Sequence, residues 1–135
     1  MKIGMKTHYL DLRNQQISLN TIRAIVCDGE RVIFLLLNNE DMEVSYYSFE
    51  KLKEALVGNY GFSRQIDVVG RTLGTKRIKD NGAPYPALIN ISLINKVAEE
   101  DWEGRIYFTD GSWLENTQGY QGMLDSLNLP TIEIE

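Results

Sequence analysis

Few side chains in this sequence could carry out chemistry on their own. The chain holds one histidine, His8, and one cysteine, Cys27, whereas nucleophilic pairs and zinc sites need several such groups placed together. Residues 70–76 lack the Gly-Lys-Ser/Thr ending of a phosphate-binding loop, and the acidic residues around 99–103 lack the spacing of a calcium loop. The residue types therefore predict no enzymatic activity, no metal site and no cofactor.

Positive charge is concentrated in one stretch of the chain. Between residues 64 and 79, five basic side chains accompany one acid, Asp67, which gives a local charge of +4. The basic residues are Arg64, Arg71, Lys76, Arg77 and Lys79. Residues 96–115 have the opposite balance, with two basic and six acidic side chains, a local charge of -4. A basic loop on an acidic protein can contact nucleic-acid phosphates through counterion release, and the alternative is a loop that keeps the protein soluble.

The elements that would position this loop are mostly strands. Turn signals separate short segments rich in β-branched and aromatic residues, which is typical of a mostly β protein, here with two short helices. Residues 22–27 and 31–37, on either side of Asp28 and Gly29, predict a hairpin. Because these segments are more apolar than alternating, we expect at least one strand to be buried on both faces. A strand over 42–47 precedes a helix over 49–57, which Ser48 caps and Gly58 terminates.

The second half of the sequence predicts a further antiparallel arrangement. Residues 61–86 indicate one strand near 66–69 and a long irregular loop. A strand over 88–98 is expected to pair, through a turn at 101–104, with a strand over 105–109. Asp110 and Gly111 favour a hairpin that returns over 112–115. Thr117 is predicted to cap a last helix over 118–127, which Asn128 and Pro130 end.

Length and composition favour one domain without a membrane anchor. The chain has 135 residues, 43% of them hydrophobic, and a net charge of -5, which excludes a uniformly basic nucleic-acid binder. The longest apolar run, residues 32–37, is too short to span a membrane, and residues 1–6 contain no apolar stretch of signal-peptide length. With a single cysteine, we expect a cytoplasmic protein that has an N-terminal extension (1–16), one domain (17–128) and an acidic tail (129–135).

Several segments, taken in order, resemble LytTR DNA-binding domains. Residues 17–25 are similar to the opening of these domains, where leucine, two residues and isoleucine lead into a strand. Residues 48–56 resemble the short amphipathic helix of the family, residues 88–97 its asparagine-containing strand, and residues 116–124 its closing segment. The resemblance covers residues 17–127. It implies an elongated arrangement of antiparallel hairpins and sheets that inserts loops into the major groove, in a bacterial transcriptional regulator.

The sequence departs from the family at its basic DNA-contacting residues. Residues 81–87, at the equivalent position, include no basic residue, and the basic pair before the closing tyrosine is replaced by Gln118 and Gly119. Residues 62–64 resemble a displaced start of the basic run, followed by an insertion that would carry the other basic residues to the same edge. Asn90 matches the asparagine of the family, which implies a nucleic-acid contact. The alternative is a structural role in which its side chain bonds neighbouring backbone.

Three functional hypotheses remain. The first is a DNA-binding transcriptional regulator of LytTR type that grips the phosphates of double-stranded DNA through the basic loop 64–79. Its predicted nucleic-acid-binding residues are Arg64, Arg71, Lys76, Arg77, Lys79 and Asn90. The second is a LytTR-like fold that has lost DNA binding and acts as a regulatory module on a protein partner or as a homodimer. The third is an unrelated β protein with a ligand or enzymatic role.

Overall fold

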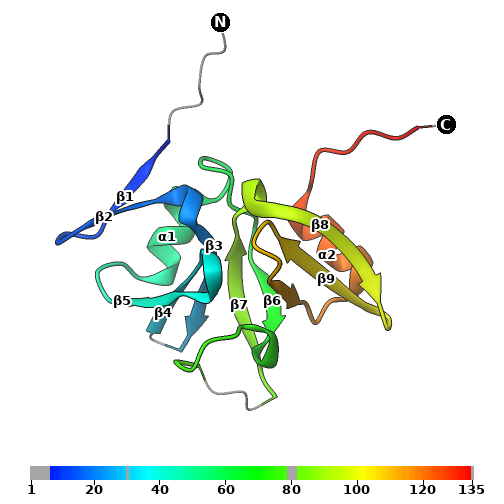
Figure 1. Cartoon of the computed structure of the whole chain (residues 1–135), viewed down its shortest axis with the longest axis horizontal. Coiled ribbons are helices and arrows are strands. Elements are labelled where there is room, and N and C mark those ends of the chain that lie inside the picture. Colours follow the sequence, from blue (N-terminus) through cyan, green and yellow to red (C-terminus); the bar gives the residue numbers. More distant parts are fainter. Residues whose placement is uncertain (1–6, 30, 79–81, 135) are drawn as a thin grey trace, which may run out of the picture.

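The computed structural model of the chain describes residues 7–29, 31–78 and 82–134, and within them three antiparallel sheets accompany two helices (Figure 1). The first sheet pairs β1 (Tyr9–Asp11) with β2 (Gln16–Ser18). The central sheet has the order β5 (Asp41–Val44), β4 (Arg31–Leu36), β3 (Ile22–Asp28), β7 (Pro84–Ile89) and β6 (Ile66–Val69). The third contains β10 (Trp113–Glu115), β9 (Glu103–Phe108) and β8 (Ile94–Glu100). The helices are α1 (Phe49–Leu56) and α2 (Gly119–Leu127), so the predicted mostly β class with two short helices is confirmed.

The central sheet is buried on both of its faces. Ala24 and Val26 point into a core that the third sheet and α2 close, whereas Ile22 and Ile25 point into a second core beneath α1 and the β1–β2 sheet. Residues 24–26 alternate between the two cores with the period of two of a strand. Ile22 is out of phase with them because the pairing of β3 with β4 shifts register between Ile22 and Ala24. The hairpin predicted at Asp28 and Gly29 is present, and its strands are buried on both faces, as their apolar sequences indicated.

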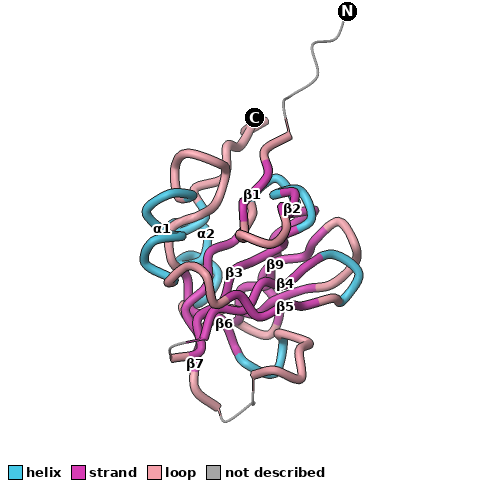
Figure 2. The backbone as a smooth tube through the Cα atoms, turned by 90° about the vertical axis from the view of Figure 1, so that its left-hand side faces the viewer, coloured by secondary structure: helices cyan, strands magenta, loops and turns pink. Residues whose placement is uncertain are grey.

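Both helices appear at the left of the strands in the view of Figure 2, but α1 packs on the second core and α2 on the first. Along the long axis of the molecule they are separated by β6 and β7 (Figure 1). The predicted cap of α1 is confirmed, because the Ser48 hydroxyl accepts a hydrogen bond from the backbone N–H of Lys51 at 3.2 Å. The predicted cap of α2 is wrong. Gln118 precedes the helix without a side-chain cap, and its own N–H is held by Asn116 Oδ1 at 3.2 Å.

The strand predicted over residues 88–98 is also wrong, because it is two strands in different sheets. The 3-10 turn η4 (Ile91–Leu93) separates β7 in the central sheet from β8 in the third. Asn90 starts this turn by accepting a hydrogen bond from the N–H of Ser92 at 3.2 Å. The same device precedes β3, where Ser18 caps the 3-10 turn η1 (Leu19–Thr21). Each turn redirects the chain into the first strand of a hairpin.

A buried ion pair joins the two hairpins that follow these turns. Arg23 of β3 is 3% exposed, and its Nε lies 3.8 Å from Asp110 Oδ2 in the turn between β9 and β10. Arg23 also donates to the carbonyl of Leu36 and to the hydroxyl of Ser112. Asp110 in turn accepts from the N–H of Asn38 at 2.9 Å. Arg23 thus donates two hydrogen bonds inside the fold, and Asp110 accepts three, two from Ser112 and one from Asn38.

The packed structure begins before the predicted domain boundary at residue 17. Residues 9–11 form β1 within the stretch predicted as an extension, and Leu12 is buried against the second core. At the other end, Leu129 still packs against the first core. Beyond it, Ile132 and Ile134 are 92% and 91% exposed. Residues 131–134 therefore follow the folded body without being covered by it.

Candidate functional site

The basic residues predicted to hold phosphates do not form one cluster. Arg64 precedes β6 and donates to the backbone carbonyl of Asp125 in α2 at 3.1 Å. Arg71, Lys76 and Arg77 follow β6, so the four-residue strand separates them from Arg64 by a span of roughly 13 Å. Lys79 lies outside the residues that the structure describes. The cations predicted to contact phosphates together therefore lie at opposite ends of β6.

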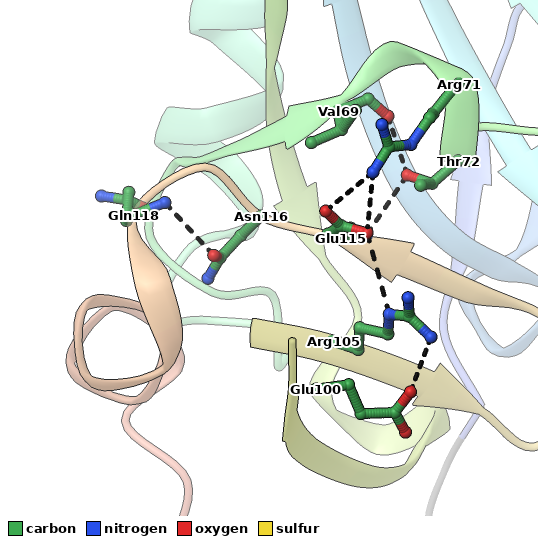
Figure 3. Close-up of polar contacts among 8 residues, drawn as sticks. All are labelled: Val69, Arg71, Thr72, Glu100, Arg105, Glu115, Asn116 and Gln118. Carbon is green, nitrogen blue, oxygen red and sulfur yellow. Dashed lines mark hydrogen bonds and ion pairs between the residues drawn. The ribbon is translucent and has the colours of Figure 1, made fainter. Parts of the chain in front are cut away.

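Arg71 is paired with a buried carboxylate. It belongs to the 3-10 turn η3 (Gly70–Thr72), and its Nη2 donates to both oxygens of Glu115 at 3.1 and 3.3 Å (Figure 3). The side chain of Glu115 is 4% exposed, whereas that of Arg71 is 63% exposed. The N–H of Glu115 donates to the hydroxyl of Thr72, which fixes the turn against β10. Arg71 therefore neutralises the carboxylate of Glu115, which is buried in the folded protein.

Arg77 is paired in the same way with an acid of the central sheet. Its Nε donates to Asp41 Oδ1 at the start of β5. Burial works against the ionisation of Asp41, but hydrogen bonds from Thr75 and Arg77, together with the charge of Arg77, lower its pKa overall. The carboxylate is thus ionised at neutral pH and the pair persists there. Lys76 is exposed, and within residues 7–29, 31–78 and 82–134 it has no ion pair.

Asn90 has no hydrogen-bonding group left for a base. Its side chain donates to the carbonyls of Leu19 at 2.9 Å and Ile22 at 3.0 Å, and its oxygen accepts from both the N–H and the hydroxyl of Ser92. The residue is 2% exposed. The geometry supports the structural alternative, in which Asn90 locks the first 3-10 turn to the second.

One face of the third sheet carries a network of charged and aromatic side chains, and η3 lies against its β10 end. Arg105 of β9 donates to Glu100 at 2.6 Å, and its Nε lies 3.7 Å from Glu115 Oε2 (Figure 3). The Tyr107 hydroxyl also donates to Glu100 at 2.6 Å. The guanidinium of Arg105 lies 4.4 Å from the ring centre of Trp113. In this network each guanidinium is already matched by a carboxylate or an aromatic ring.

The tip of the β8–β9 hairpin presents the most exposed aromatic ring of the described residues. Trp102 is 88% exposed. Asp101 and Trp102 have φ angles of +51° and +70°, the left-handed conformation that Asn and Gly adopt most readily in a two-residue turn. The sequence predicted a turn at residues 101–104. Positive φ at a bulky residue is not encoded by a local signal, so its exposure became visible only in the structure.

The single cysteine and the single histidine make different contacts in the fold. A cavity of about 410 Å³ is lined in part by Cys27, Ser48 and Glu50. Burial and the nearby charges of Asp28 and Glu50 raise the pKa of the Cys27 thiol, which disfavours the reactive thiolate. His8 lies elsewhere, with its ring 4.9 Å from that of Tyr60. Among residues 7–29, 31–78 and 82–134, no three His, Cys, Asp or Glu side chains gather to hold a metal ion.

Comparisons with known proteins give this chain no relatives. It matches no protein-family model, no curated protein and no solved structure. In the part of the chain that the structure describes, neither helix has the length and apolar character needed to cross a membrane.

Proposed function

We propose that this chain is a LytTR-like domain that has lost DNA binding and acts as a protein-interaction module without catalytic activity. The observation that carries the proposal is the pairing of two of the five predicted phosphate-binding cations with carboxylates of the same domain. Arg71 holds the buried Glu115, and Arg77 holds Asp41. Support for the LytTR-like part comes from the order of a hairpin, a short helix, an asparagine-capped turn, a second hairpin and a closing helix.

The energies favour the internal pairs over phosphate contacts. Removing Arg71 from Glu115 leaves a buried carboxylate short of a partner, which costs about 1–3 kcal/mol. One phosphate contact gains roughly 1 kcal/mol from counterion release at physiological salt. With a net charge of -5, the rest of the protein also repels a polyanion. The free energy gained from one phosphate contact is therefore smaller than the free energy lost when Arg71 leaves Glu115.

Trp102 supports a contact with another protein. Holding a non-glycine residue in the left-handed region costs about 1–2 kcal/mol, and the exposed ring recovers none of this through burial in the domain. Tryptophan is among the residues that contribute most to protein interfaces. An indole displayed on a hairpin tip beside the open face of the third sheet is well placed to anchor a partner.

The loss of DNA binding is tested by fluorescence anisotropy. A labelled duplex DNA of random sequence is titrated with the whole chain at several salt concentrations. We expect no saturable binding at low salt. Saturable binding that weakens steeply with salt, and that is flattened in the variant Arg64→Ala/Lys76→Ala/Arg77→Ala, would show that the cations reach phosphates and would overturn the proposal.

The protein-interaction part is tested by site-specific photocrosslinking in cells. A benzophenone amino acid is placed at position 102 and, as a control, at position 9, where Tyr9 is also exposed at 62%. We expect a discrete protein adduct from position 102 and not from position 9. Equal adducts from both positions, or none from either, would contradict a role for the hairpin tip.

A further inference from the structure

The core between the third sheet and α2 has apolar side chains at its margin that are only partly buried. Six such side chains come from the end of η4, from β8, from α2 and from the residue pair after α2. They are Leu93, Ile94, Val97, Tyr120, Leu124 and Leu129. We call these six residues the β8 rim. The rim marks where an additional element would complete the core.

The edge beside the rim is ready to accept a strand. β8 is a terminal strand of its sheet, with β9 as its one neighbour, so every second residue directs its N–H and C=O groups away from the sheet. Val97 faces the core, whereas Lys96 faces the opposite side, where its ammonium lies 4.6 Å from the ring centre of Tyr107. A strand added here would meet an apolar surface on one face and a positive charge on the other.

Residues 131–134 have the pattern that matches this edge. Ile132 and Ile134 alternate with Thr131 and Glu133, which is the period of a strand with one apolar face. Both isoleucines are more than nine-tenths exposed, and no strand of the described structure pairs with this segment. The chain runs from the end of α2 away from the sheets (Figure 1). On β8, the isoleucines would cover the rim and Glu133 would lie on the side of Lys96.

We propose that residues 131–134 of a second copy of this chain add a strand to β8, and that two copies exchange these segments reciprocally. A second copy supplies the segment because residues 131–134 run away from the sheets of their own chain (Figure 1). The start of β8 offers Lys96 to this acidic segment, ahead of Glu99 and Glu100, whereas β5, at one edge of the central sheet, carries Asp41 and Glu43 and no cation. The inference rests on the proposed function and names one partner for the β8–β9 hairpin. Since each added strand is short, we expect a weak dimer, with a dissociation constant of roughly 10–100 μM.

Sedimentation velocity of the whole chain across that concentration range tests the proposal. We expect the wild type to dimerise and Ile132→Glu/Ile134→Glu to stay monomeric at every concentration. The fold should be unchanged, because both side chains are exposed. The matched control Tyr9→Glu places a charge at another exposed apolar site and should dimerise like the wild type. A monomeric wild type, or a dimer that survives the double substitution, overturns the proposal.

A charge exchange tests the register of the added strand. Lys96→Glu should weaken dimerisation about tenfold or more by opposing Glu133, and Lys96→Glu combined with Glu133→Lys should restore it. Failure of the rescue would contradict the contact between these two residues. The photocrosslinking at position 102 separates this proposal from the proposed function, because a monomeric chain that still crosslinks to another protein refutes the exchange alone.

Discussion

Hairpins β3–β4 and β8–β9 each follow a 3-10 turn that a polar side chain caps, Ser18 before the first and Asn90 before the second. The first hairpin lies inside the central sheet with a core on each face. The second belongs to the third sheet, with one face on the first core, and within the described residues β8 is an edge strand of that sheet. Two hairpins that begin in the same way, after a capped 3-10 turn, are therefore buried to different extents.

The difference separates strands whose side chains are covered from a hairpin that exposes several of its side chains. β3 and β4 contribute fully buried side chains such as Ile25 and Ile33. The β8–β9 hairpin contributes the exposed Trp102, the charged network around Arg105 and the partly covered rim. The partner surface proposed above lies on the second hairpin, which is less covered than the first.

Truncation of equivalent apolar side chains should show the contrast most strongly. Ile33→Ala removes a fully buried side chain of β4 and should lower the free energy of unfolding by about 4 kcal/mol. Val97→Ala, at a half-buried position of β8, should cost about 1 kcal/mol. Urea denaturation followed by circular dichroism measures both. Equal losses would mean that β8 is as well covered as β4.

Breaking the ion pair between the hairpins should have the next largest effect. Asp110→Asn leaves Arg23 buried without its counterion and should cost about 3 kcal/mol at pH 7. Burial opposes ionisation of Asp110, but hydrogen bonds from Ser112 and Asn38 and the charge of Arg23 lower its pKa overall.

Because the pKa of Asp110 is lowered by folding, the stability it contributes is present above the pKa of the unfolded state, about 3.9, and is lost as the pH falls through the lower folded value. The difference in unfolding free energy between wild type and Asp110→Asn should therefore shrink below about pH 4. A difference that stays constant down to pH 2 would contradict this role for the charge.

Removing the buried cap, Asn90, should lower the free energy of unfolding more than removing the exposed cap, Ser18. Asn90→Ala removes the donors to two backbone carbonyls and the cap of η4, and should cost about 2 kcal/mol. Ser18→Ala removes one exposed capping bond and should cost about 1 kcal/mol or less. Thermal unfolding of the two variants side by side provides the comparison. A larger loss for Ser18→Ala would refute the locking role of Asn90.

The smallest expected effect is an increase in the free energy of unfolding. Trp102→Gly relieves the left-handed strain at the hairpin tip and should raise the free energy of unfolding by up to about 1 kcal/mol. The same change should abolish the photocrosslinked partner when the probe is moved to the neighbouring position 103. A loss of stability would mean that the ring serves the fold rather than an interface.

Local signals in the sequence were sufficient to predict several elements of the fold. The β3–β4 hairpin, α1 with its Ser48 cap and the β9–β10 turn were predicted because the residues that determine them are neighbours in the chain. The break at Asn90 was not, since the alternation of Ile89, Ile91 and Leu93 is equally typical of a continuous strand. β1 and β2 have three residues each and give no periodic signal.

The charge distribution illustrates a different limit. Counting charges along residues 64–79 predicted a positive surface, but the acids that neutralise Arg71 and Arg77 are 44 and 36 residues away in sequence. A charge count over residues 64–79 therefore includes both arginines and neither of their acidic partners. Whether a basic stretch is available to a polyanion depends on contacts that only the folded topology creates.

The most direct test of the central claim releases the paired cations. Asp41→Asn/Glu115→Gln frees Arg77 and Arg71, and the control Glu54→Gln/Glu99→Gln makes the same change in net charge at exposed acids that hold neither arginine. With labelled duplex DNA, the wild type and the control should show no saturable binding, whereas the release variant should bind with a salt slope near -2, about -0.9 for each phosphate contact. Equal behaviour of the wild type and the release variant would contradict the claim that these internal ion pairs keep the domain off DNA.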